Sequence, residues 1–213
     1  MSVSCEDYYR QLHASCGVVL SASFQADDKG QHAVAHQWIS DLLRWHDVLA
    51  HRPESGLILA SLAEYQFALL ALVLGQYRQA FMSLRLSLEL LLGGVYYSAN
   101  ELHLRLWMNG QKDLVWSALI SLDDGVFSKT FVGAFCEDLV DCARQYGAIA
   151  GGVYRECSEY VHGNAQTHSE QSGKVMFQDE AFQTWHSKAK SVRLLMPAQP
   201  GPVPNLGTCS CMV

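Results

Sequence analysis

The sequence predicts an all-α fold, an antiparallel bundle of helices with helical extensions at its N- and C-terminal ends. Apolar residues recur at steps of three and four along several long segments, which is the period of a helix with one buried face. No stretch alternates between apolar and polar residues for long enough to indicate a strand. The chain has 213 residues, 49% of them hydrophobic, and a chain of this size and composition can bury a substantial core.

The length also predicts the domain organisation. A chain of 213 residues has the usual size of one domain with extensions. We therefore expect a single helical domain over residues 1–196, with its core at about residues 55–165. Residues 197–213 are rich in proline, and we expect them to form a flexible tail.

Four long helices are expected in the first half of the chain, over residues 4–26, 31–50, 57–74 and 76–98. The third is strongly apolar, and only Gly75 separates it from the fourth. Such a tight connection favours antiparallel neighbours that pack along their whole length.

Shorter helices are expected in the second half, over residues 100–107, 111–121, 129–147, 151–163 and 179–196. Ser128 precedes the third of them and is a residue type that caps helix N-termini. Residues 165–176 are polar and are expected to form a loop.

The charge balance limits the partners that the chain can bind. The formal net charge is −6, and an acidic protein is a poor candidate for non-specific duplex binding, which needs a basic surface. The densest basic cluster lies in the last helix and consists of His186, Lys188, Lys190 and Arg193. We expect it either to contact RNA or an acidic partner, or to form a solvated helix face.

Compartment and membrane signals point to a cytoplasmic protein without a membrane span. The N-terminus lacks the basic and apolar regions of a signal peptide. The apolar stretch from Leu57 to Leu74 contains Glu64, and because a carboxylate is unfavourable in lipid we expect a buried helix. The seven cysteines are odd in number and lack a disulfide-scaffold spacing, so we expect free thiols in a reducing compartment.

The most informative segment runs from Gly151 to Asn164 and reads GGVYRECSEYVHGN. We expect it to form a short helix, because its apolar residues fall on one side at 3.6 residues per turn. Glycines at both ends suit the start and the stop of this helix. Arg155 and His162 fall together on the polar side, separated by roughly 10 Å along the helix axis.

These residues resemble the Arg-x(4–6)-His motif of the HEPN superfamily, all-helical domains that include many metal-independent ribonucleases. In this chain the motif is Arg155-x6-His162. The segment from Tyr77 to Tyr97 is similar to the long core helix that precedes the motif helix in that superfamily. The two segments together place the resemblance at about residues 55–165.

The resemblance implies an endoribonuclease that acts as a toxin or an anti-phage defence effector. It implies an RNA substrate, no cofactor, and 2′,3′-cyclic phosphate product ends. It also implies a homodimer in which the motif helices face each other across a two-fold axis. An antitoxin or another defence-system protein is a further expected partner.

The same resemblance assigns expected roles to individual residues. His162 is expected to act as general acid and base, because its ordinary pKa lies near neutrality. Arg155 is expected to bind the phosphate oxygens. Ser158 and Asn164 are expected to hold the phosphate or to orient His162.

Glu156 and Arg85 are two further candidates for phosphate binding or for support of the site. Glu156 follows Arg155 where many catalytic members carry Asn, Asp or His, and its charge repels phosphate. Arg85 lies four residues before Glu89, so it forms either a local ion pair with that residue or a support for the site from the neighbouring helix.

Other functions remain open at this point. Glu156 and the acidic composition favour a catalytically inactive HEPN-like module that scaffolds or regulates a protein partner. The motif is also compatible with a solvated helix face that ends in a histidine, which the helix dipole favours.

No metal site is expected from the sequence. Three local groupings of possible ligands occur, namely His32 with His36, His13 with Cys16, and Cys209 with Cys211. None of them has a third and a fourth ligand nearby in the sequence.

Overall fold

The computed structural model describes residues 4–162 and 175–196, and in these ranges every regular element is a helix. In chain order the elements are α1 (Cys5–Ala26), α2 (Gln31–Leu49), α3 (Ser55–Val73), α4 (Tyr77–Ser98), α5 (Glu101–Met108), α6 (Trp116–Leu119), α7 (Lys129–Phe135), the 3₁₀ turn η1 (Glu137–Leu139), α8 (Val140–Glu159) and α10 (Asp179–Leu194). The all-α prediction and the bounds of the four long N-terminal helices are confirmed to within two residues.

Helices α3 and α4 form the antiparallel hairpin at the centre of the bundle. The chain reverses at Gly75, whose φ of +74° is a backbone conformation that glycine adopts readily. The buried Ser61 hydroxyl of α3 donates to the Ser87 carbonyl of α4 over 2.7 Å. The two helices also supply half of the largest fully buried side chains, among them Tyr65, Phe81 and Leu88.

Helix α3 is long and apolar enough to cross a membrane by length and composition alone. In the bundle, 56% of its most apolar 18-residue stretch is buried inside the protein. The buried part of its apolar surface is therefore accounted for by its position in the core, as the sequence predicted.

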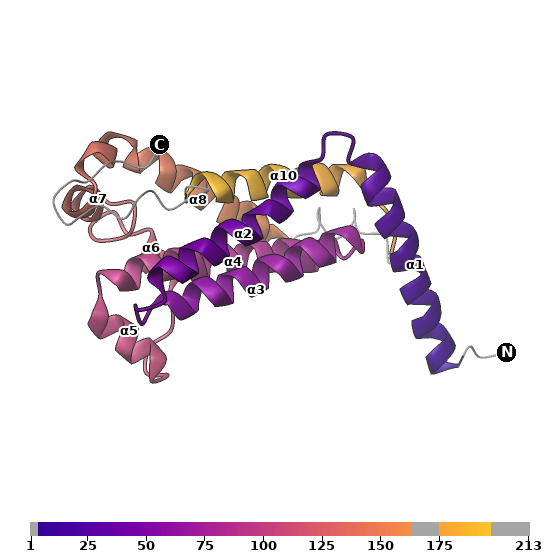
Figure 1. Ribbon diagram of the computed structural model, residues 1–213, viewed down its shortest axis with the longest axis horizontal. Helices are drawn as coiled ribbons and strands as arrows, with labels where there is room; N and C mark the ends of the chain where they lie inside the picture. Colours follow the sequence, from indigo (N-terminus) through magenta and orange to yellow (C-terminus); the bar gives the residue numbers. More distant parts are fainter. Residues whose placement is uncertain (1–3, 163–174, 197–213) are drawn as a thin grey trace.

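Three helices pack around this hairpin. Helix α2 lies on α3, α8 lies on α4, and α10 contacts α2, α4 and α8 together (Figure 1). Phe182 and Trp185 of α10 are completely buried, and the Trp185 indole donates to the Ala80 carbonyl over 3.0 Å. Helix α10 is thus part of the core rather than an extension of it, and the core reaches beyond the expected residues 55–165.

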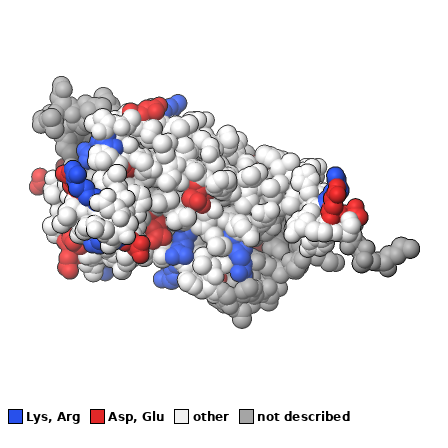
Figure 2. Space-filling model, turned by 90° about the horizontal axis from the view of Figure 1, so that it is seen from below, with Lys and Arg blue, Asp and Glu red and all other residues white. Residues whose placement is uncertain are grey.

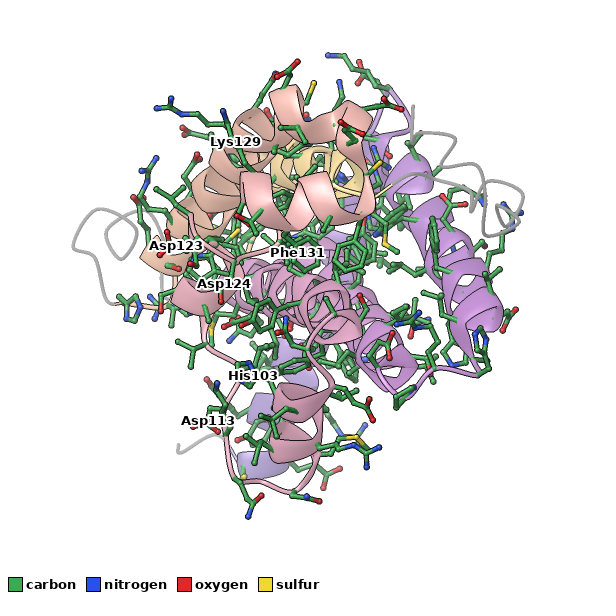
Figure 3. The ribbon with its side chains drawn as sticks, turned by 90° about the vertical axis from the view of Figure 1, so that its left-hand side faces the viewer. His103, Asp113, Asp123, Asp124, Lys129 and Phe131 are labelled. Carbon is green, nitrogen blue, oxygen red and sulfur yellow. The ribbon has the colours of Figure 1, made fainter. Side chains whose placement is uncertain are left out.

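The two ends of the bundle differ. Helix α1 packs on the turn between α3 and α4 through Cys16 and Val19, while its N-terminal half projects away from the bundle (Figure 1). Helices α5, α6 and α7 close the opposite end. Figure 3 views that end and shows His103, Asp113 and Asp124 on separate elements of its surface.

Three of the expected shorter helices have different bounds. Only residues 116–119 of the expected helix 111–121 are helical. Ser128 caps α7 through the Phe131 amide, as predicted, but α7 ends at Phe135. The chain then re-enters a helix at Val140 that continues to Glu159. The predicted break before residue 151 is therefore wrong.

The hairpin core provides a matched test of packing. Leu88 is completely buried and Leu86 on the same helix is 41% exposed. We expect Leu88→Ala to lower the free energy of unfolding by about 2–5 kcal/mol, because it leaves a cavity in a close-packed core. We expect Leu86→Ala to change it by less than about 0.5 kcal/mol. Urea denaturation of both variants checks this, and equal losses would contradict the described burial.

Candidate functional site

The motif residues lie on the second half of α8 and just beyond its end. Gly151 and Gly152 are interior helical residues with negative φ, and a Cβ atom at either position would meet no other atom within 4 Å. The helix passes through them because its buried face is continuous, with Ala150, Val153 and Cys157 packed into the core. The opposite face, which carries Arg155, points to solvent.

Arg155 and His162 are both exposed. His162 lies three residues beyond the last helical residue, but its amide still donates to the Ser158 carbonyl over 3.0 Å. The turn therefore continues the course of the helix as far as His162. Within the part of the chain that the structure describes, no hydrogen bond or ion pair engages either side chain. Both side chains therefore face solvent in the described part of the chain.

The motif lies away from the α5–α7 end of the bundle. The Tyr160 ring stacks on Phe81, with ring centroids 3.9 Å apart and planes 8° from parallel. Phe81 lies near the start of α4, whereas α5 follows the end of α4. The C-terminal end of α8 is therefore at the end of the bundle on which α1 packs.

Glu156 forms an ion pair with Lys188 of α10. The Lys188 side chain is only 19% exposed, while that of Glu156 is 45% exposed. The positive charge of the paired lysine offsets the negative charge of Glu156, which would repel a phosphate beside Arg155. The sequence does not reveal this ion pair, because Lys188 lies 32 residues further along the chain.

Arg85 of α4 and two aromatic residues form a stack at the interface between α4 and α8. Its guanidinium carbon lies 4.3 Å from the centroid of the Tyr154 ring, and the guanidinium also donates to the Tyr154 hydroxyl. The Trp116 indole stacks on Tyr154 with centroids 3.8 Å apart and planes 4° from parallel. Two groups this close to one ring must occupy opposite faces, so Tyr154 lies between Arg85 and Trp116.

This stack answers the question that the sequence left open for Arg85. Its direct contact is with α8 rather than with Glu89, although its charge still acts to lower the pKa of the Glu89 carboxyl against the larger effect of burial, which raises it. The Arg85 Nε atom is buried and has no hydrogen-bond partner within the described residues. Arg85 thus packs against the motif helix, and its Nε–H group has no acceptor among the described residues.

The remaining predicted site residues have other surroundings. The Ser158 hydroxyl donates to the Tyr154 carbonyl of its own helix over 2.6 Å. Asn164 lies outside the described residues. Cys157 is buried within the motif segment, and burial raises the pKa of its thiol to about 12, which keeps the thiol protonated at neutral pH.

The basic cluster expected on α10 is dispersed in the structure. His186 is buried, and the Arg193 guanidinium donates to the Val34 carbonyl over 2.6 Å. Lys188 holds Glu156, which leaves Lys190 as the exposed member. Of the four residues only Lys190 is exposed, so they do not form one exposed basic surface.

Comparison of the chain with protein-family models, curated proteins and solved structures gives no match.

The continuity of α8 through the paired glycines gives a sharp test. Both glycines are helical and open to space, so we expect Gly151→Ala and Gly152→Ala each to raise the free energy of unfolding by about 0.5–1 kcal/mol. The matched control is Gly75→Ala, where φ is +74° and a Cβ atom would lie 3.0 Å from Val19 Cγ1. We expect that variant to be destabilised by at least about 1 kcal/mol. Chemical denaturation measures all three, and destabilisation at residues 151 and 152 would indicate a helix break there.

Proposed function

We propose that this protein is a metal-independent endoribonuclease of the HEPN type, acting as a toxin or an anti-phage defence effector. The observation that carries the proposal is the exposed, uncommitted pair of Arg155 and His162 on one course of α8. The all-helical fold and the long core helix α4 beside α8 support it. An antitoxin or another defence-system protein is the partner that such a role requires.

The chemistry that these residues offer suits RNA, because RNA supplies its own nucleophile. An imidazole removes the proton of the 2′-hydroxyl, and the resulting oxygen attacks the adjacent phosphorus. The bond from phosphorus to the 5′-oxygen breaks, and that oxygen takes up a proton from an imidazolium. The Arg155 guanidinium binds the phosphate oxygens on which charge develops. The products are a 2′,3′-cyclic phosphate and a 5′-hydroxyl end.

Neighbouring charges favour this role for the site. Lys188 pairs with Glu156, so the residue beside Arg155 does not present an uncompensated negative charge to the substrate. Arg85 stacks on Tyr154, the residue before Arg155, and brings a second guanidinium to the α8 region. Both contacts hold charged groups in place before a substrate binds, which is the form of electrostatic stabilisation that accelerates phosphoryl transfer.

The first test is loss of cleavage in a His162→Ala variant. We expect RNA cleavage to persist in a chelator and to fall by at least about 100-fold in His162→Ala, because general acid and base catalysis contributes at least that factor. Helical circular dichroism should be unchanged, since His162 is exposed. The matched control is His51→Ala, another exposed histidine, which should retain activity. Cleavage that survives His162→Ala would refute the assignment, and absence of cleavage in the wild type would favour the inactive scaffold.

The proposed working unit is a homodimer with a composite site. Within one chain, Arg155 and His162 are two helical turns apart, roughly 10 Å along the axis. Their backbone positions therefore cannot both lie close to one phosphate. A two-fold contact between motif helices would bring a second Arg155 and a second His162 to the same cleft.

The protein also has apolar surface that could contribute to an interface. Figure 2 shows a broad face with few charges between the charged groups at the two ends of the molecule. The exposed apolar side chains of α3 include Phe67 and Leu70, which are 60% and 54% exposed. Such surface favours association between protein molecules.

Mixing two inactive variants tests the composite site. We expect Arg155→Ala and His162→Ala subunits each to be inactive alone and to recover part of the activity when mixed, because a mixed dimer combines the His162 of one chain with the Arg155 of the other. Light scattering at the assay concentration should give the mass of two chains. A fully active monomer would exclude a shared cleft.

A further inference from the structure

Two buried histidines meet where α10 packs on α2. His32 lies in the first turn of α2 and is 8% exposed, and His186 lies in the middle of α10 and is 4% exposed. Their imidazole rings meet edge to face, with centroids 5.6 Å apart and planes 86° from parallel. Histidines are seldom buried without a partner that satisfies both ring nitrogens.

One ring nitrogen of each histidine is left unsatisfied. His32 Nδ1 and His186 Nε2 are buried and have no hydrogen-bond partner among the described residues. The surrounding groups are aromatic: Phe24 meets His32 edge to face, and Phe182 and Trp185 meet His186 in the same way. Such surroundings accommodate a neutral imidazole but provide no acceptor for the second N–H of an imidazolium.

The charged groups around the pair do not compensate for this burial. Asp27 is the one that favours a positive charge, but its carboxylate already accepts the backbone amides of Gln31 and His32, at 2.7 and 2.9 Å. His36 opposes protonation of His32, and Arg193 opposes that of His186. Burial is the largest effect on both rings and lowers both pKa values, that of His186 to about 4.

The other polar contacts between α2 and α10 lie on either side of the histidines. The Gln31 amide donates to Gln183 over 2.7 Å, and Arg193 donates to the Val34 carbonyl over 2.6 Å. The groups that form these two contacts keep the same charge between neutral and mildly acidic pH. Of these contacts, the histidine pair is therefore the one that can take up a proton in this pH range.

We propose that the His32–His186 pair is an acid-sensitive latch, which holds α10 against α2 at neutral pH and releases it when an imidazole takes up a proton.

The direction of the effect follows from linkage. A histidine whose pKa is lower in the closed state than in the open one stabilises the closed state fully above the ordinary value near 6.5. This contribution is lost as the pH falls from about 6.5 towards about 4, where the closed state of His186 also takes up the proton. Acidification therefore favours a state in which α10 has separated from α2.

Release of α10 would also reach α8, because Lys188 on α10 holds Glu156 beside Arg155. Without Lys188, the Glu156 charge would repel a phosphate at that position. This consequence for RNA rests on the proposed function. The latch itself does not, and it can be tested without any activity assay.

The test is hydrogen exchange of the intact chain, measured by mass spectrometry at about pH 7.5 and about pH 5. Protection factors, corrected for intrinsic exchange, should fall about 30-fold in α10 and the first turns of α2 if His186 alone carries the effect, given its closed-state pKa of about 4 and an open-state pKa of about 6.5. The double variant His32→Phe/His186→Phe keeps aromatic rings at both positions but cannot titrate. It should lose most of this change, while His51→Phe, at an exposed histidine, should retain it.

Histidine nitrogen NMR of the wild-type protein provides a second measurement that does not depend on the folding of the double variant. Both buried rings should stay neutral well below their ordinary pKa while α10 remains protected. Rings that titrate near 6.5 with α10 still protected would overturn the proposal. An acid-induced loss of protection that is identical in wild type and double variant would overturn it as well.

Discussion

The close packing of α3 against α4 is the constraint on which the other elements depend. The three-residue connection between the helices, with a glycine in the left-handed region at Gly75, forces them into antiparallel contact. Because both helices are apolar around most of their circumference, they bury one another and still leave apolar surface for neighbours. Helix α2 covers part of that surface, and α8 and α10 cover another. The position of the motif helix is thus set by the core.

Much of this fold could be predicted from periodicity. The sequence predicts the bounds of the first four helices and the start of α10 accurately, because apolar residues recur there at steps of three and four over many residues. The predicted bounds are less accurate after Ser98, where the helices are short and their ends depend on local sequence signals. The paired glycines at 151 and 152 predict a break, because glycine disfavours helix interiors. The buried face of α8, with Ala150 and Val153 on either side of them, outweighs that preference.

The site was only partly visible in the sequence. Arg155 and His162 could be singled out because they belong to one segment, and both are exposed in the structure. Their surroundings could not be found in the same way. The pairing of Glu156 with Lys188 and the stack around Tyr154 depend on the relative positions of α4, α8 and α10. No pattern within one helix reveals which residue of another helix will lie opposite.

The projecting half of α1 affects how the molecule moves through solution. A bundle with a helical arm at one end is elongated rather than spherical (Figure 1). An elongated particle experiences more friction than a sphere of the same mass, so it diffuses more slowly. A size estimated from migration alone would therefore exceed the 23.7 kDa of one chain even for an isolated molecule. Sedimentation velocity, which separates shape from mass, would show a raised frictional ratio that falls when residues 1–15 are removed.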